Sequence, residues 1–251
     1  MNNSIQIIPL ANLALTLVPV LAVVGILYKW SLNYRNSLYA ISRMLVQLLL
    51  IGYLLTYIFE SNRSWIVIVV LVVMVFASSW IALSTIKAQR RRLYLKALYS
   101  IAIGGTITLL LITKAVLDLQ PWYWPRYFIP LAGMVFANAM NSVSLAAERL
   151  EAEMKRDVHY QKARGIALRA SLIPITNSLF AVGLVSLPGM MTGQILSGIS
   201  PLIAVRYQIM VMCMIFSAAG LSAACFLVFI RADLDNWSAG LARRTDYSSA
   251  H

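Results

Sequence analysis

Apolar residues occur along this chain in long blocks, and they do not alternate with polar residues as they do on an amphipathic surface. Blocks of about 18 or more apolar residues are typical of membrane-spanning helices. Such segments are expected to be helical because lipid cannot satisfy free backbone N–H and C=O groups. We therefore predict an all-α, polytopic integral membrane protein of about seven transmembrane helices. The predicted spans are residues 9–28, 39–59, 64–86, 97–117, 129–147, 176–196 and 203–230.

The path of the segment at 176–196 is left open by the sequence. Pro188, Gly189 and Gly193 interrupt its apolar run. Proline removes a helical hydrogen-bond donor, and glycine lowers helix stability. A broken or re-entrant element is therefore an alternative to a straight span at this place.

Composition agrees with a membrane protein. The chain is 60% hydrophobic and 12% charged, whereas soluble domains usually have about 25% charged residues. Its net charge of +12 comes from basic residues in the short connections between apolar blocks. Membrane topology and anionic lipid headgroups explain this placement, so we expect lipid contacts and no nucleic-acid partner.

The lysines and arginines also predict the orientation. If the N-terminus lies outside, sixteen of the 21 fall in the inner connections and four on the outer side. Inner loops of membrane proteins are enriched in these residues. We predict an N-out, C-in, multi-pass protein of the cell inner (plasma) membrane.

Carboxylates and histidines are absent from the middle of the predicted spans. Such groups often carry proton or ion coupling, so their absence favours a channel or a transporter driven from outside the chain. The sequence also lacks a GxxxxGK[ST] phosphate loop and the GxSxG, HExxH and CxxC patterns. We expect no enzyme, no nucleotide motor and no cofactor in this chain.

Uncharged polar residues do occur inside the predicted spans. Hydrogen bonding between helices is their usual role, and lining a substrate path is the alternative. These residues are Gln47, Ser78, Ser79, Thr106, Thr108, Asn138, Asn141, Ser142, Gln194 and Gln208.

Candidate path-lining residues combine some of these amides with two methionines. They are Gln47, Asn138, Asn141, Met190, Met191 and Gln194. Methionine usually fills gaps in packing, and its thioether favours Cu(I) over iron as a ligand. No cluster of His, Asp, Glu and Cys indicates a metal site, and Cys213 and Cys225 are expected to be buried apolar side chains.

The longest polar stretch, 148–172, reads ERLEAEMKRDVHYQKARGIALRASL. Acidic residues come first and basic residues follow, which suits a helix dipole, and Glu151 and Lys155 are spaced to pair. Pro174 is expected to mark a boundary before the next apolar block. The pattern predicts an amphipathic helix on the inner face, either a simple connection or a coupling helix that docks onto a partner.

Several stretches resemble the FetB-like family of ABC exporter permeases, small bacterial iron-export permeases with plant relatives in aluminium tolerance. The resemblance is carried by VGLVSLPGMMTGQIL (182–196), SGISPLIAVRYQIMV (197–211), SRMLVQLLLIGYLLTYIF (42–59), IPLAGMVFANAMNSVSL (129–145) and LRASLIP (168–174). It implies that residues 1–251 form a single transmembrane permease domain, acting as a homodimer with a separate ATPase subunit that binds ATP. Iron or another metal ion would be the exported species.

The resemblance gives a role to the inner connection, and the chemistry of proline and glycine suggests one for the signature block. The inner connection would contact the ATPase through Lys155, Arg156, Lys162, Arg164 and Arg169. In the signature block, the proline and the GxxxG spacing suggest a kinked, closely packed hinge, with packing without movement as the alternative. The hinge residues are Ser186, Pro188, Gly189 and Gly193.

Two other functions remain open at this stage. A stand-alone channel or secondary carrier needs no ATPase, and a membrane scaffold or receptor transports nothing. The transported substrate and the oligomeric state are not fixed by the sequence.

Overall fold

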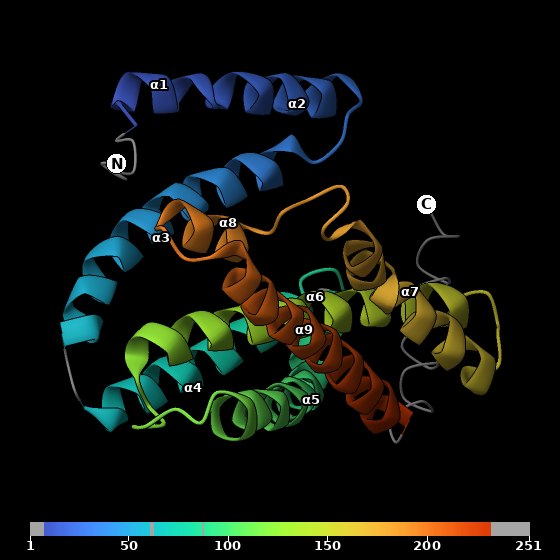
Figure 1. Ribbon diagram of the computed structural model, residues 1–251. Helices are drawn as coiled ribbons and strands as arrows, with labels where there is room; N and C mark the ends of the chain where they lie inside the picture. Colours follow the sequence, from blue (N-terminus) through green and yellow to red (C-terminus); the bar gives the residue numbers. More distant parts are fainter. Residues whose placement is uncertain (1–7, 61–62, 87, 232–251) are drawn as a thin grey trace. The chain divides into compact units, whose positions relative to one another are not determined.

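The computed structural model describes residues 8–60, 63–86 and 88–231, and these are almost entirely helical, without β-strands (Figure 1). The elements are α1 Leu10–Leu15, α2 Leu17–Lys29, α3 Tyr34–Glu60, α4 Ser64–Ala82, α5 Arg90–Leu110, the π-helical turn η1 Leu111–Val116, α6 Pro125–Met154, α7 Tyr160–Ala181, α8 Gly189–Leu196 and α9 Pro201–Ile230. The chain divides into two compact units, Met1–Asn62 with Leu196–Gly198 and Arg63–Ile195 with Ile199–His251.

Six helices of the described residues are long and apolar enough to cross a membrane. They are Ala11–Lys29, Tyr34–Phe59, Ser64–Ala82, Arg90–Val116, Pro125–Met154 and Pro201–Ile230. Each corresponds to one of the predicted spans, so the prediction of an all-α, polytopic membrane protein is confirmed. The segment 176–196 is the predicted span that has no such helix.

That segment is broken in the structure, as the alternative for it allowed. The chain leaves α7 at Ala181, makes a turn and begins α8 at Gly189. In the turn, Gly183 has a φ of +83°, which suits a glycine, and its N–H donates to the Ser186 carbonyl at 3.0 Å. Pro188 lies immediately before α8, where its missing N–H removes no helical hydrogen bond. Six spans would place both chain ends on one side, so the predicted N-out, C-in orientation requires that the α7–α8 segment also crosses.

The predicted inner helix 148–172 is not one helix, and that part of the prediction is wrong. Its first part is the end of α6, and its second part is the beginning of α7. Residues 155–159 form a turn between them, in which Asp157 has a φ of +57° that no right-handed helix accommodates. We call residues 155–159, which fall on the predicted inner side, the inner turn. The expected Glu151–Lys155 pair is confirmed, with 3.1 Å between carboxylate oxygen and Nζ.

Pro174 is also not a helix boundary, because it lies inside α7. Proline is tolerated in membrane helices where neighbouring groups satisfy the freed backbone. The missing N–H of Pro174 frees a carbonyl in the preceding turn of α7, and in that turn the Ser142 hydroxyl of α6 donates to the Ser171 carbonyl at 3.3 Å.

The core of the second unit lies where α5, α6 and α9 meet, and α9 runs across the other two (Figure 1). Small residues dominate this contact, among them the fully buried Ala132, Ala139 and Ala218. A Cβ built on Gly104 would overlap the Ser222 hydroxyl and lie 2.7 Å from the Ser222 backbone nitrogen. Small residues at such crossings let helix backbones approach closely, which is how helices associate in a membrane.

Candidate functional site

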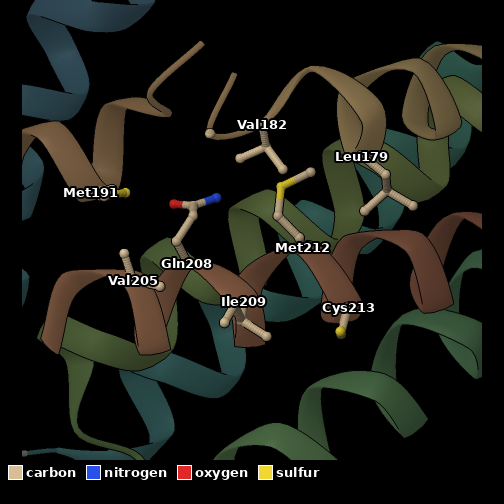
Figure 2. A pocket seen from close by; sticks show the side chains of 9 residues that line it. Leu179, Val182, Met191, Val205, Gln208, Ile209, Met212 and Cys213 are labelled. Atoms are coloured by element: carbon tan, nitrogen blue, oxygen red, sulfur yellow. The ribbon is translucent and has the colours of Figure 1, made fainter. Parts of the chain in front are cut away.

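A cavity of about 320 Å³ lies between the end of α7, the turn after it, α8 and α9, entirely within the second unit. We call it the apolar chamber. Figure 2 shows eight of its lining side chains labelled on these elements. The lining residues are Leu179, Val182, Gly183, Met191, Val205, Gln208, Ile209, Met212 and Cys213. Its size lies at the lower end of the range for small-molecule sites, about 300–1,000 Å³.

One face of α9 forms the floor of the apolar chamber. Val205, Gln208, Ile209 and Met212 follow the i, i+3, i+4, i+7 spacing that aligns side chains on one helix face. The opposite wall comes from α7, the turn and α8, and it can fold over α9 because the chain breaks after Ala181. The break in the 176–196 segment therefore creates the chamber.

Gln208 carries the only side-chain amide among the lining residues of the chamber. The residue is 5% exposed, and its Oε1 is buried with no hydrogen-bond donor in the described part of the chain. Figure 2 shows the amide between Met191 and Met212. A buried amide oxygen without a partner costs free energy, so a ligand that donates a hydrogen bond to it would be favoured. The oxygen itself is enclosed, so the amide or a flanking side chain must turn before a ligand reaches it.

Cys213 stands at the edge of the chamber and is exposed. The expectation that both cysteines are buried apolar side chains is therefore wrong for Cys213, while Cys225 is partly buried. Ile209 is also exposed, at 59%. The chamber is thus open on one side to the surroundings of the chain.

A second, polar cavity of about 90 Å³ lies between α6 and α7. It is lined by Asn138, Asn141, Ser142, Leu145, Ser171, Pro174, Ile175 and Ser178. The Ser142 hydroxyl donates to the Ser171 carbonyl across the helix pair at 3.3 Å, and the Asn138 amide donates to the Met134 carbonyl at 2.8 Å. A cavity of this size with several polar partners has room for ordered water. We call it the polar cavity.

The six predicted path-lining residues are distributed over several places. Asn138 and Asn141 line the polar cavity, and Met191 lines the apolar chamber. Met190 faces a third cavity, of about 120 Å³, together with Met134 and Met210.

The two remaining candidates are glutamines. Gln47 is exposed on α3, in the first unit. Gln194 is partly buried on α8, and its Oε1 has no donor among the described residues. Gln208 and Met212 line the apolar chamber together with Met191, and the path-lining prediction did not include them.

The predicted hinge residues lie in and after the turn that precedes α8. Ser186 accepts a backbone hydrogen bond in the turn, and Pro188 precedes the helix. A Cβ built on Gly189 or Gly193 would meet no atom within 4 Å. The close helix approach predicted from the GxxxG spacing is therefore not found at these glycines within the described residues, although a hinge role stays a prediction.

The predicted coupling residues lie at the inner turn and along α7. Lys155, Arg156, Lys162 and Arg169 are exposed, and Arg164 is partly buried. The buried carboxylate of Glu153 lies 2.7 Å from Arg149 and 3.8 Å from Arg156. This pairing holds the end of α6 rigid next to an exposed, basic turn, and a surface of this kind suits a partner protein.

Tyr160, the first residue of α7, ties the inner turn to α9. Its hydroxyl donates to the Leu227 carbonyl. Burial raises the pKa of Tyr160, and the nearby charges of Arg164 and Arg231 oppose this shift. The phenol therefore stays protonated at neutral pH and keeps its donor.

No group of three or more His, Cys, Asp or Glu residues lies together in residues 8–60, 63–86 and 88–231. The cavities described above are lined by aliphatic, thioether, amide and hydroxyl groups, with Arg126 as a lining residue of the third one. The lining of the apolar chamber suits an organic molecule better than a hard cation, which prefers several oxygen or nitrogen ligands.

A family model and several known proteins match this chain over most of its length. The model of the uncharacterised protein family UPF0014 matches residues 10–234. A UPF0014 membrane protein of Synechocystis is 35% identical over 222 residues, covering 80% of this chain and 84% of the relative. The probable iron export permease protein FetB of Escherichia coli is 34% identical over 241 residues, covering 87% and 90%.

A plant protein is similar as well. Protein ALUMINUM SENSITIVE 3 of Arabidopsis thaliana is 36% identical over 228 residues, covering 84% of this chain and 81% of the relative. No solved structure matches the chain.

Proposed function

This chain belongs to the UPF0014 family of membrane proteins, and from that premise we propose that it is the membrane-spanning permease subunit of an ATP-driven exporter. The observation that carries the proposal is the similarity to the probable iron export permease FetB, which extends over 87% of this chain. The energy source would be a separate ABC-type ATPase, since the sequence itself has no phosphate-binding loop.

The inner turn supports docking of such an ATPase. A docking element must be exposed, rigid and chemically distinct from lipid-facing helix. Residues 155–159 connect two long helices and expose Lys155 and Arg156, and Glu151 and Glu153 pair with them from α6. Two copies of the chain with two ATPase subunits would complete the exporter in the inner membrane. The name of the bacterial relative suggests iron as the exported species.

The docking proposal is tested by reversing charge at the inner turn. The double variant Lys155→Glu, Arg156→Glu should lose co-purification with the ATPase and lose transport-coupled ATP hydrolysis, because both charges face the proposed partner. A matched control is Lys114→Glu, an exposed lysine in η1 on the predicted outer side, which should leave the complex intact.

The exporter proposal is tested by reconstitution. Transport should require both the ATPase and ATP. Full transport by this chain alone in ATP-free liposomes would contradict the proposal and favour a stand-alone channel or carrier. Failure of any ATPase to co-purify, together with no transport, would favour a scaffold.

A further inference from the structure

We propose that the apolar chamber binds a small apolar organic molecule that donates one hydrogen bond to the Gln208 amide. This inference goes beyond the exporter proposed above, whose suggested cargo is iron, and it does not depend on that function. Binding itself is a property of the chain. The proposal names a class of ligand for a site that the family comparison does not assign.

The size of the chamber points to a molecule instead of an ion. Its volume of about 320 Å³ is at the lower end of the range for small-molecule sites. Its walls are mainly aliphatic and thioether side chains, and Gln208 supplies the only side-chain amide. A dehydrated iron ion needs several hard ligands, and this lining offers one amide oxygen.

The orphan oxygen of Gln208 indicates what the ligand must carry. Gln208 is 5% exposed and its Oε1 has no donor in the described part of the chain. A lipid acyl chain can fill apolar space, but it cannot donate a hydrogen bond. A ligand with one O–H or N–H group satisfies the oxygen and buries its own apolar surface at the same time.

Two methionines flank the amide, from different elements. Met191 comes from α8 and Met212 from α9, and Figure 2 shows the Gln208 amide between them. Methionine side chains are flexible and polarisable, so they adapt to ligands of different outline. Cys213 and Ile209 at the exposed edge leave a way in from outside the chain.

The experiment uses a pair of probes that differ only in the donor. Saturable binding of 2-naphthol and of 2-methoxynaphthalene is measured on the full chain in lipid nanodiscs, with empty nanodiscs giving the background. We expect 2-naphthol to bind about three- to tenfold more tightly, which is the usual effect of one neutral hydrogen bond. In Gln208→Leu the two probes should bind equally.

A second pair of variants locates the site. Ile209→Trp places an indole at the chamber, and it should abolish saturable binding of both probes. Ile203→Trp makes the same change at an exposed position of α9 that does not line the chamber, and it should leave binding unchanged. Circular dichroism and thermal unfolding of each variant show whether it folds as the wild type does.

Every outcome bears on the proposal. No saturable naphthol binding, equal binding of both probes to the wild type, or equal binding by the two tryptophan variants overturns it. Equal binding of the two probes would indicate a lipid-filled groove, and saturable binding of Fe²⁺ without naphthol binding would indicate a metal site. Because no ATPase is present, these results are independent of the reconstitution test of the exporter.

Discussion

Two glycine pairs differ sharply in this molecule. Gly189 and Gly193 have the GxxxG spacing associated with close helix contact, yet a Cβ on either would meet nothing within 4 Å. Gly104 and Gly105 are adjacent and have no such spacing, yet both are tightly enclosed, by Ser222 and by Phe136. Spacing alone therefore does not identify a packed glycine, since what matters is which helix crosses that position.

The difference also separates two kinds of structure. The Gly104–Gly105 crossing joins α5 to α9 and α6 in the buried core of the second unit, where interiors are close-packed. The Gly189–Gly193 segment borders cavities and follows a break in the helix. A region with free space around its glycines can rearrange at low cost, and a closed crossing cannot. The Gly189–Gly193 segment therefore suits movement, and the Gly104–Gly105 crossing suits support.

The largest effect is expected for Gly104→Leu. The new side chain would collide with the Ser222 backbone, whose Cα lies 3.0 Å from the built Cβ, so α9 must shift. We expect a loss of stability of about 3 kcal/mol or more, at the upper end of overpacking effects. Thermal unfolding in detergent measures the loss. The control is Gly165→Leu in α7, where nothing lies within 4 Å, and equal stability of the two variants would refute the comparison.

A smaller effect is expected for Gly105→Ala. Its methyl group would lie 2.5 Å from Cε1 of the Phe136 ring, and a ring can move where a backbone cannot. We expect a loss of about 1–2 kcal/mol. Combining it with Phe136→Leu should give a loss below the sum of the two single losses, because the second change makes room for the first. Strict additivity in unfolding measurements would show that the ring is not the obstacle.

The smallest effect on stability is expected for Gly189→Leu. With open space at the position, the variant should insert normally and unfold within about 0.5 kcal/mol of the wild type. In the reconstituted exporter it should nevertheless stop transport if the segment is a hinge that closes during the cycle. Wild-type transport by this variant would rule out the hinge, and a large loss of stability would mean that the position is packed after all.

Much of the fold follows from the sequence because long apolar blocks in lipid can form only helices. The break near Pro188 was also foreseeable, since proline and two glycines fall close together there. Pro174 shows the limit of such local rules: a single proline does not end α7, and the Ser142 hydroxyl of the neighbouring α6 supplies a donor to the turn before it. The split of 148–172 into two helix ends was likewise missed, since no glycine or proline marks the turn at Asp157.

The site was harder to foresee than the fold. Gln208 was recognisable as a polar residue inside a span, but its spacing does not tell which face of α9 meets α7 and α8. Met190 and Met191 are neighbours in sequence and line different cavities, because consecutive helical residues point in different directions. Gly104 and Ser222 meet only through the tertiary fold, and no local pattern connects them.

The hydrogen bond from Tyr160 to Leu227 has a mechanical consequence. It fastens the first residue of α7 to the last turns of α9, the helix whose other half forms the floor of the apolar chamber. A partner that displaced the inner turn would have to break this hydrogen bond or move α9 together with α7. Movement of the first turn of α7 would then reach the apolar chamber through the length of α9.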